Sequence, residues 1–476
     1  MYLPSYVKTC IDALEEAGFA AYAVGGCVRD SLLGLEPADY DLCTAALPDQ
    51  TEAVFHNYKL VLAGKKHGTV GVVTEGGVVE ITTFRTEGAY LDNRHPEWVE
   101  FVEDVTGDLA RRDFTVNAMA WSPIRGFADP FGGQEDLKNH ILRAVGDAAT
   151  RFREDSLRIL RGARFAAKYR LIPDPETEQA MFALTDLMEN LARERVFDEL
   201  CKLITHADTA DLLRFAPIVT AVIPELAPCV GFDQHNPHHA YDIFEHTARV
   251  VEGVPNDLTL RWAALLHDVG KPESFTQEEN GRGHFYGHPK ISAGLADVIL
   301  RRLKAPTALR EDVVFLCDRH MVTLEPERKL LRRRLSQYGE ARTKMLLALQ
   351  RADLIATGTR TAEEAAYYDD VEAILNALLA EDQCFQIRDL AVNGNDLMAL
   401  GLKGKAIGQT LQQLLNLVIE EQVANEKEAL LHAASSCPPS FMRGVAEAQR
   451  GRGEYMNLPS CDTDSPLPLR GIPPHK

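Results

Sequence analysis

The residue pattern of this chain changes near residue 150, and that change constrains its fold more than any other feature. Before it, short runs rich in Val, Ile and Thr and bounded by Gly predict strands at 21–26, 69–74 and 78–85. After it, Leu, Ala, Glu and Arg follow helical spacing, and no strand pattern of similar quality appears. We therefore expect an α+β fold, with a small α/β head followed by an all-α remainder.

The composition is that of an ordinary globular protein, with 45% hydrophobic and 25% charged residues. At 476 residues the chain is too long for one compact core, so we expect several domains. No apolar run approaches the ~20 residues that span a bilayer, and the first residues lack a signal-peptide pattern. The nine cysteines are scattered without a CxxC pair, which favours a reduced, cytoplasmic protein. We predict no membrane partner, and the sequence leaves the oligomeric state open.

The net charge of −19 argues against a nucleic-acid partner, but two segments oppose it. Residues 138–170 hold nine Lys and Arg against three Asp and Glu, and residues 290–351 hold fourteen against seven. Basic segments of this kind bind phosphate backbones, and they are equally typical of solvated helix faces. Charge alone does not decide between the two interpretations.

A Gly-Gly pair ends the strand predicted at 21–26. Gly25 and Gly26 stand where that strand would pass into a short helix, and Arg29 lies one turn further on. Glycines at such a turn let backbone N–H groups approach a phosphate, although most Gly-Gly pairs are plain turns. We take Gly25, Gly26 and Arg29 as candidate nucleotide-binding residues.

Two carboxylates, Asp39 and Asp41, lie two positions apart in a segment that we expect to be extended. Alternate residues of a strand point to the same face, and like charges held together are costly without a cation between them. Hard oxygen donors suit Mg²⁺, which also takes triphosphate oxygens. Glu80, in the strand predicted at 78–85, is a candidate third carboxylate. The sequence thus predicts a catalytic magnesium site made by Asp39, Asp41 and Glu80.

Two arginines, Arg111 and Arg112, precede a segment of alternating apolar character. Arginines beside a carboxylate cluster can bind a triphosphate through paired hydrogen bonds. A surface ion pair with Asp108 or Asp113 is the ordinary alternative.

A helix is expected over 151–168, with Asp155 and Arg158 three positions apart on one face. Asp can accept from the exocyclic amine of cytosine or adenine, and Arg can donate to a ring nitrogen or a carbonyl. Taken alone, an intrahelical salt bridge would be the commoner explanation. Arg161 and Arg164 continue at three-residue steps and would be available for phosphates.

Histidines and carboxylates form a separate pattern in the helical part. His246 precedes His267 and Asp268, which end an apolar helical run. Imidazole and carboxylate at a helix end can turn onto one divalent metal, and Asp353 is a candidate fourth ligand. Two further histidines could extend the site to a second metal: His288 and His320. The pattern predicts a divalent transition-metal site whose metal the sequence does not identify.

In unbroken order over residues 20–205, the chain carries the motifs GGCVRDSLLG, DYDLCT, RRDFTVNAMA, DPFGGQEDL, REDSLRILRGARF and ERVFDEL. This series closely resembles the class II tRNA nucleotidyltransferase family, the CCA-adding enzymes and their bacterial poly(A) polymerase relatives. The resemblance implies a nucleotidyltransferase-fold head, Mg²⁺ as cofactor, and tRNA, CTP and ATP as partners.

The same resemblance implies residue roles. Asp39 and Asp41 would hold the catalytic metals. Nucleotide binding would fall to Gly26, Arg29, Arg112, Asp155 and Arg158, with Arg161 and Arg164 beside them. Of these, Asp155 and Arg158 would select the incoming base.

The histidine pattern H…HD…H…H…D, on a helical background, resembles the HD phosphohydrolase domain. In that family the ligands activate water for phosphoester hydrolysis. The alternative is an HD domain that has lost its activity and remains as a helical body.

We expect five regions: a head at 1–140, a helical neck at 141–210, an HD domain at 211–380, a helical tail domain at 381–435 and a disordered end at 436–476. The leading function is addition of CCA to tRNA 3′ ends from CTP and ATP. Addition of A or C alone, and poly(A) synthesis, are alternatives because these enzymes share the motifs. In a different class, the chain would be an HD phosphohydrolase with a degenerate head, which the intact DxD and EDxxR motifs argue against.

Overall fold

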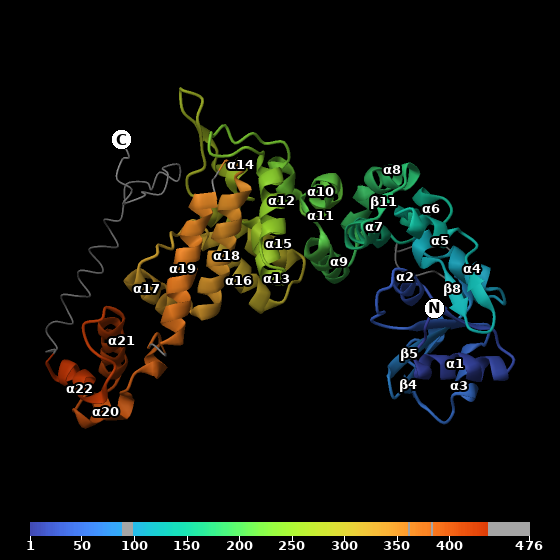
Figure 1. Ribbon diagram of the computed structural model, residues 1–476, viewed down its shortest axis with the longest axis horizontal. Helices are drawn as coiled ribbons and strands as arrows, with labels where there is room; N and C mark the ends of the chain where they lie inside the picture. Colours follow the sequence, from blue (N-terminus) through green and yellow to red (C-terminus); the bar gives the residue numbers. More distant parts are fainter. Residues whose placement is uncertain (88–98, 360–361, 382–383, 437–476) are drawn as a thin grey trace. The chain divides into compact units, whose positions relative to one another are not determined.

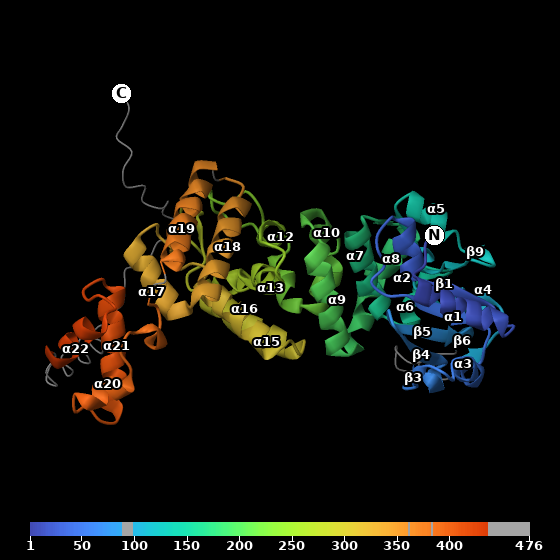
Figure 2. The same ribbon diagram turned by 60° about the horizontal axis from the view of Figure 1, so that its bottom comes forward.

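The computed structural model describes residues 1–87, 99–359, 362–381 and 384–436 (Figure 1; Figure 2 turns the same view by 60°). Residues 1–227 with 299–305 form one compact unit, and residues 228–298 with 306 onward form a second. Within the described part, no helix is both long and apolar enough to cross a membrane.

The expected α+β fold is confirmed, because a sheet occupies the head and the rest of the described chain is mainly helical. The domain limits taken from the sequence stay predictions. Of the end predicted at 436–476, all but Ser436 lies outside the described residues.

A seven-stranded mixed sheet forms the head, in the order β3-β4-β5-β2-β1-β8-β9. Its strands are β1 (Ala21–Val24), β2 (Asp41–Thr44), β3 (Lys59–Val61), β4 (Thr69–Thr74), β5 (Gly77–Thr83), β8 (Ala120–Ser122) and β9 (Gly126–Ala128). β2 pairs with β5 in parallel, and the other pairings in this sheet are antiparallel. β1, β4 and β5 confirm the three strands predicted from the sequence.

The head also contains helices and a second, two-stranded antiparallel pair. The helices are α1 (Ser5–Glu16), α2 (Gly26–Leu32), α3 (Pro48–Val54), α4 (Val105–Ala110) and α5 (Gly133–Lys138), with 3₁₀ turns η1 (Lys65–His67) and η2 (Thr115–Asn117), and β6 (Arg85–Glu87) pairs with β7 (Val99–Phe101). α1 buries the residues that its helical spacing puts on one face, among them Val7, Ile11 and Leu14. Leu42 of β2 and Ile81 of β5 are fully buried, so the strands that carry the carboxylates are anchored in the core.

Six helices follow in the first unit: α6 (Ala148–Glu154), α7 (Leu157–Tyr169), α8 (Pro175–Ala183), α9 (Arg193–His206), α10 (Thr209–Arg214) and α11 (Ala216–Val222). The prediction of one helix over 151–168 is wrong, because the chain breaks between α6 and α7. Asp155 is extended there, with φ −138° and ψ 101°, and its Oδ1 accepts from the backbone N–H of Leu157 at 3.1 Å. A short Asp side chain competes with a helix for backbone groups in this way. The parallel pair β10 (Ile141–Leu142) and β11 (Ile172–Pro173) is an exception to an all-α neck.

The second unit is a helical bundle. Helices α12 (Ile243–Gly253), α13 (Leu258–Leu266), α16 (Thr307–Arg319) and α18 (Glu340–Ala356) pack against one another. Their interior includes the fully buried side chains of Trp262, Leu316 and Leu349. Between α13 and α16 the chain forms α14 (Lys271–Ser274), the hairpin β12 (Thr276–Gln277) and β13 (Gly283–His284), and α15 (His288–Arg302), which begins in this unit.

The chain then forms α17 (Arg328–Tyr338), α19 (Ala362–Ala380) and a small group of helices with its own apolar core. That group contains α20 (Gly394–Ala399), α21 (Lys405–Ile419) and α22 (Lys427–Ser436), and Leu397, Leu414 and Leu430 are buried within it.

The basic residues of α17 form ion pairs with other parts of the protein. Its cations pair with carboxylates near the ends of α19 and α21: Arg328 with Glu381, Lys329 and Arg333 with Glu420, and Arg332 with Glu421. Cations that already have carboxylate partners are less available to an RNA backbone. This part of segment 290–351 therefore favours the structural interpretation of its charge.

Candidate active sites

Three carboxylates lie together on the head sheet. The parallel register of β2 and β5 puts Asp41 opposite Glu80, and Asp39 stands two residues before Asp41, ahead of the strand. Each side chain keeps exposed surface, yet the protein around Asp41 displaces much of its water. This burial, with the charges of Asp39 and Glu80, raises the pKa of Asp41 to about 6, and the charge of Arg112 opposes the rise. Oxygen donors that repel one another fit a hard divalent cation such as Mg²⁺.

Arg112 lies beside these carboxylates and against Gly25. Gly25 has φ +75°, which favours glycine, and α2 begins at the next residue. A Cβ on Gly25 would lie 2.6 Å from Nη1 of Arg112, whereas one on Gly26 would meet nothing closer than 3.6 Å. Nη2 of Arg112 donates to Oδ2 of Asp108 at 3.4 Å, so the ion pair given as the alternative is present, while its buried Nε has no hydrogen-bond partner among the described residues. The glycine turn therefore holds a guanidinium that is already paired on one side with a carboxylate.

Arg29 is buried, with 5% of its surface exposed. Its guanidinium donates to Oδ1 of Asn117, to the hydroxyl of Tyr169 and to Oδ1 of Asp30. It also lies over the Tyr169 ring, 4.1 Å from the centroid. Arg29 thus ties α2 to the end of α7, and its contact with a nucleotide stays a prediction.

The residues expected to select the base do not pair with each other. Oδ2 of Asp155 accepts from Nη2 of Arg195 on α9 at 2.9 Å. Arg158 donates instead to Oε2 of Glu154 at 2.7 Å and to the carbonyls of Arg111 and Arg151. The prediction that Asp155 and Arg158 share one helix face is wrong because the break at Asp155 separates them.

Arg161 and Arg164 are also bound to carboxylates. Nη2 of Arg161 donates to Oδ2 of Asp113 at 2.6 Å, and Nε of Arg164 lies 2.6 Å from Oε2 of Glu199. Burial alone would raise the pKa of Asp113, but the charge of Arg161 and hydrogen bonds from Arg161 and Asn117 lower it below its usual range. Asp113 therefore stays ionised and fixes α7 against the head.

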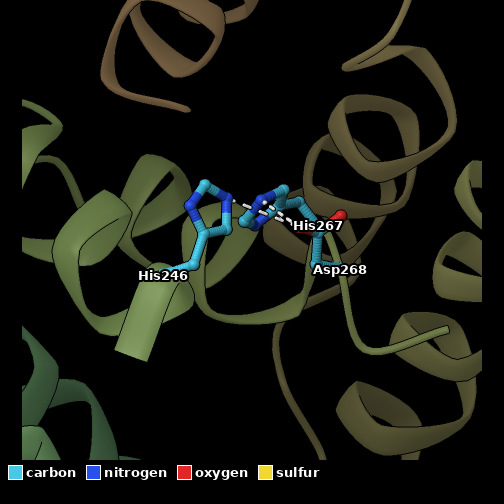
Figure 3. Close-up of side chains that lie close together, drawn as sticks. All are labelled: His246, His267 and Asp268. Carbon is cyan, nitrogen blue, oxygen red and sulfur yellow. Dashed lines mark ion pairs between the residues drawn. The ribbon is translucent and has the colours of Figure 1, made fainter. Parts of the chain in front are cut away.

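A second group of candidate ligands lies in the helical bundle, where His246, His267 and Asp268 approach one another (Figure 3). Nε2 of His246 is 3.0 Å from Oδ1 of Asp353 and 3.5 Å from Oδ2 of Asp268. Nε2 of His267 is 3.1 Å from the same oxygen of Asp268. The structure thus brings together the four residues that the sequence grouped first.

Asp268 also faces the two other histidines. Its Oδ1 lies 3.3 Å from Nε2 of His288 and 3.7 Å from Nε2 of His320, and these two nitrogens are 3.0 Å apart. His288, His320 and Asp268 form a second possible ligand group that shares Asp268 with the first. We refer to all six residues as the histidine cluster.

The four imidazole rings of the histidine cluster all use Nδ1 for the same kind of contact. Nδ1 of each ring faces a backbone carbonyl: His246 that of Ala356 at 3.3 Å, His267 that of Ala264 at 2.8 Å, His288 that of Phe285 at 2.8 Å, and His320 that of Cys317 at 2.7 Å. A hydrogen bond from Nδ1 to a carbonyl leaves the lone pair on Nε2, where a metal would bind. The Nε2 atoms of His246 and His267 are buried and form no hydrogen bond with the described residues.

Asp268 and Asp353 stabilise the protonated form of His267 within the histidine cluster. Burial alone would lower the pKa of His267, but Asp268 and Asp353 raise it to about 10. The pKa values of Asp268 and Asp353 lie well below their usual range despite burial, because the histidines face them. A divalent cation would supply the same charge to nitrogen and oxygen donors of a suitable type.

Comparison with known proteins places the chain in a family. Family models match the poly A polymerase head domain at residues 21–143, the RNA and SrmB-binding site of polymerase A at 170–229, and tRNA nucleotidyltransferase domain 2 at 274–434. The CCA-adding enzyme of Streptococcus thermophilus is 32% identical over 440 residues, which cover 90% of this chain and 97% of the relative. The chain belongs to the CCA-adding enzyme family. The CCA-adding enzyme of Limosilactobacillus fermentum is 34% identical over 430 residues, covering 90% and 95%.

A solved CCA-adding enzyme shares the fold. The structure of the Bacillus stearothermophilus CCA-adding enzyme in complex with CTP matches with a TM-score of 0.68 and 27% identity, over 94% of this chain and 100% of that one. The family resemblance seen in the motifs is therefore confirmed. Nucleotidyltransferases of this family use divalent metal ions, and the three carboxylates of the head fit that use.

In this member of the CCA-adding enzyme family, the structure adds residues that sequence reasoning did not assign. They hold the predicted nucleotide-binding side chains in place: Asp113, Asn117, Tyr169, Arg195 and Glu199. Four of them lie inside the RRDFTVN and ERVFDEL motifs, so the motifs already pointed to these residues. Their partners are far away along the chain, and only the folded structure shows which residues pair.

Proposed function

We propose that this chain adds CCA to the 3′ end of tRNA, using CTP and ATP with Mg²⁺. The observation that carries the proposal is the group of Asp39, Asp41 and Glu80 beside Arg112, in a chain that matches CCA-adding enzymes over nearly their full length. Because the reaction needs tRNA, CTP and ATP together, we place it in the cytoplasm.

The reaction is an in-line displacement at the α-phosphate of the incoming nucleotide. The terminal 3′-oxygen of tRNA forms a bond to that phosphorus and loses its proton, and the bond to pyrophosphate breaks. Bound Mg²⁺ supplies charge stabilisation and lowers the pKa of the attacking hydroxyl. Asp39 and Asp41, with Glu80 beside them, are the ligands that we assign to it.

Other residues of the chain orient the nucleotide. We assign the triphosphate to Arg112 and to the backbone of Gly25 and Gly26, where a guanidinium and close backbone approach meet. Asp155 would accept from the exocyclic amine of cytosine or adenine, which uracil and guanine do not present at that position. The carboxylate is held by Arg195, so its orientation is set before the base arrives.

The test is incubation of tRNA transcripts that end before CCA with CTP, ATP or both, followed by sequencing of the products. We expect CC with CTP alone and CCA with both nucleotides. Products ending in A alone, in C alone or in a long A tract would contradict the proposal in favour of the A-adding, C-adding or poly(A) alternatives.

A second activity is favoured by the orientation of the histidine cluster. Four imidazoles that turn Nδ1 to carbonyls and Nε2 to two carboxylates are typical of a metal centre with an ordered outer shell. We propose that the cluster binds one or two divalent transition metals and hydrolyses phosphoesters, as in HD phosphohydrolases. Metal analysis and hydrolysis of p-nitrophenyl phosphate and bis(p-nitrophenyl) phosphate test it, and a metal-free, inactive wild type would contradict it.

A further inference from the structure

A fifth imidazole, that of His239, stands beside the histidine cluster without belonging to it. Its ring meets that of His246 edge to face, with centroids 5.3 Å apart. Its nitrogens belong to neither group of ligand atoms that lie close enough together to share a metal ion. Nδ1 of His239 is buried and has no hydrogen-bond partner among the described residues. A buried polar nitrogen left unpaired is costly, which indicates a partner from outside the chain.

Hydrogen bonds hold the loop that carries His239 in place. The backbone N–H of Ala240 donates to the carbonyl of Thr357 at 2.9 Å, and Oγ1 of Thr359 donates to the carbonyl of His238 at 2.7 Å. Both anchors follow α18, the helix that carries Asp353. His239 is thereby held on the side of the cluster where Asp353 lies.

Solvent reaches the histidine cluster on this same side. The side chain of Asp353 is 21% exposed, while those of His246, His267 and Asp268 are 0–2% exposed. A ligand approaching the metal positions from solvent would therefore meet Asp353, on the side where the loop of His239 is anchored.

A cation that is already paired with a carboxylate lies near His239. Lys271 is buried nearby, where its Nζ donates to Oδ2 of Asp268 and to Oε1 of Gln234, each at 2.8 Å. An imidazole carries at least one N–H donor whether it is neutral or protonated. A metal-bound phosphoester would bring negatively charged oxygens to this place, which the donor can satisfy.

We propose that His239 is a substrate-contacting residue of the histidine cluster, with its Nδ1–H donating to a phosphoryl oxygen of the phosphoester. This inference rests on the phosphohydrolase activity proposed above, and it adds a residue that neither the motifs nor the ligand groups assign. Monoesters and diesters share the phosphoryl oxygen that the contact needs, so the test includes both.

The competing explanation is that His239 only packs against His246. Two variants separate the explanations. His239→Phe keeps a ring for the edge-to-face contact and removes the donor, whereas His239→Asn removes the ring and keeps an amide N–H close to the position of Nδ1. His238→Ala, the neighbouring histidine, is the matched control.

The experiment uses the full-length, metal-loaded protein. For each variant, metal content is measured by mass spectrometry, binding of inorganic phosphate by calorimetry, and hydrolysis of p-nitrophenyl phosphate and bis(p-nitrophenyl) phosphate by absorbance. We expect His239→Phe to keep its metal. Its dissociation constant for phosphate and its KM for both esters should each rise about tenfold, equivalent to ~1.4 kcal/mol. His239→Asn and His238→Ala should stay close to wild type in all three measurements.

Different results would contradict different parts of the inference. Normal phosphate binding by His239→Phe would overturn the inference, as would a wild-type protein that binds metal but no phosphate. Loss of metal in His239→Asn with normal behaviour of His239→Phe would show that His239 acts only by packing. A wild type that binds phosphate but hydrolyses neither ester would contradict the proposed hydrolysis and leave the contact of His239 with phosphate standing.

Discussion

Replacing Gly25 by alanine should disturb the head in two separable ways. An alanine at φ +75° and ψ −122° occupies a region that L-residues avoid, at a cost of about 1–3 kcal/mol. Its Cβ would also lie 2.6 Å from Nη1 of Arg112, so the guanidinium would have to move. A charge-assisted hydrogen bond to a triphosphate is worth about 1.5–3 kcal/mol, so its loss would lower kcat/KM roughly ten- to a hundredfold.

The assay compares CMP incorporation into tRNA lacking CCA with urea unfolding of the same variants. Gly25→Ala should lose both stability and activity. Gly26→Ala is the matched control for stability, because its Cβ would meet nothing closer than 3.6 Å and it lies in a helix. Gly26→Ala should fold as well as wild type.

A double-mutant cycle identifies the cause of the lost activity. If Gly25→Ala acts by displacing Arg112, it should lower kcat/KM far less in an Arg112→Ala background than in wild type. A full, additive loss in that background would refute the role given to Arg112. Unchanged activity of Gly25→Ala alone would refute the whole argument.

Three further predictions concern the base-selecting segment, the histidine cluster and α21. Asp155→Ala should relax selection against UTP and GTP about ten- to a hundredfold in single-nucleotide incorporation, because a base contact is worth ~1–3 kcal/mol, and unchanged selectivity would leave Asp155 only a partner of Arg195. Asp268→Ala should lose the metal of the histidine cluster while CCA addition persists; loss of both activities in a folded protein would show that the sites are coupled. Hydrogen bonds from Arg333 and Lys329 lower the pKa of Glu420 from 4.5 to about 2, so their stabilisation is complete above pH 4.5 and is lost as pH falls toward 2. The protection factors of α21 amides, which correct for the intrinsic pH dependence of exchange, should fall more across that window in wild type than in Glu420→Gln, and identical profiles would contradict the ion pairs.

The strand that carries Glu80 was predictable because its sequence is rich in Val, Ile and Thr and follows a glycine pair, whereas β2 was expected only as an extended segment around Asp39 and Asp41. Glu80 was proposed as a third carboxylate without any strand order, and only the parallel register of β2 and β5 places it opposite Asp41. The histidine pattern could be read from the sequence because these residue types are uncommon together.

The break between α6 and α7 was not predictable from helical spacing. The apolar spacing continues through Asp155, and only the hydrogen bond from the backbone of Leu157 to its side chain shows that the helix stops there. The ion pairs were also beyond sequence reasoning, because Arg161 finds Asp113 far back in the chain. Charge counts likewise could not show that the cations of α17 are bound to carboxylates near α19 and α21.

The central claim is that the carboxylates of β2 and β5 carry out CCA addition, and Asp41→Asn tests it most directly. The substitution keeps the shape of the side chain and removes one of three charges that repel each other. We therefore expect unchanged or slightly higher stability in urea, with transfer of CMP and AMP to tRNA lacking CCA reduced at least about a hundredfold, or ~2.7 kcal/mol. Asp12→Asn, on α1, where the half-buried side chain pairs with Lys8, is the control and should transfer normally. Transfer by Asp41→Asn at a tenth or more of the wild-type rate would contradict the account.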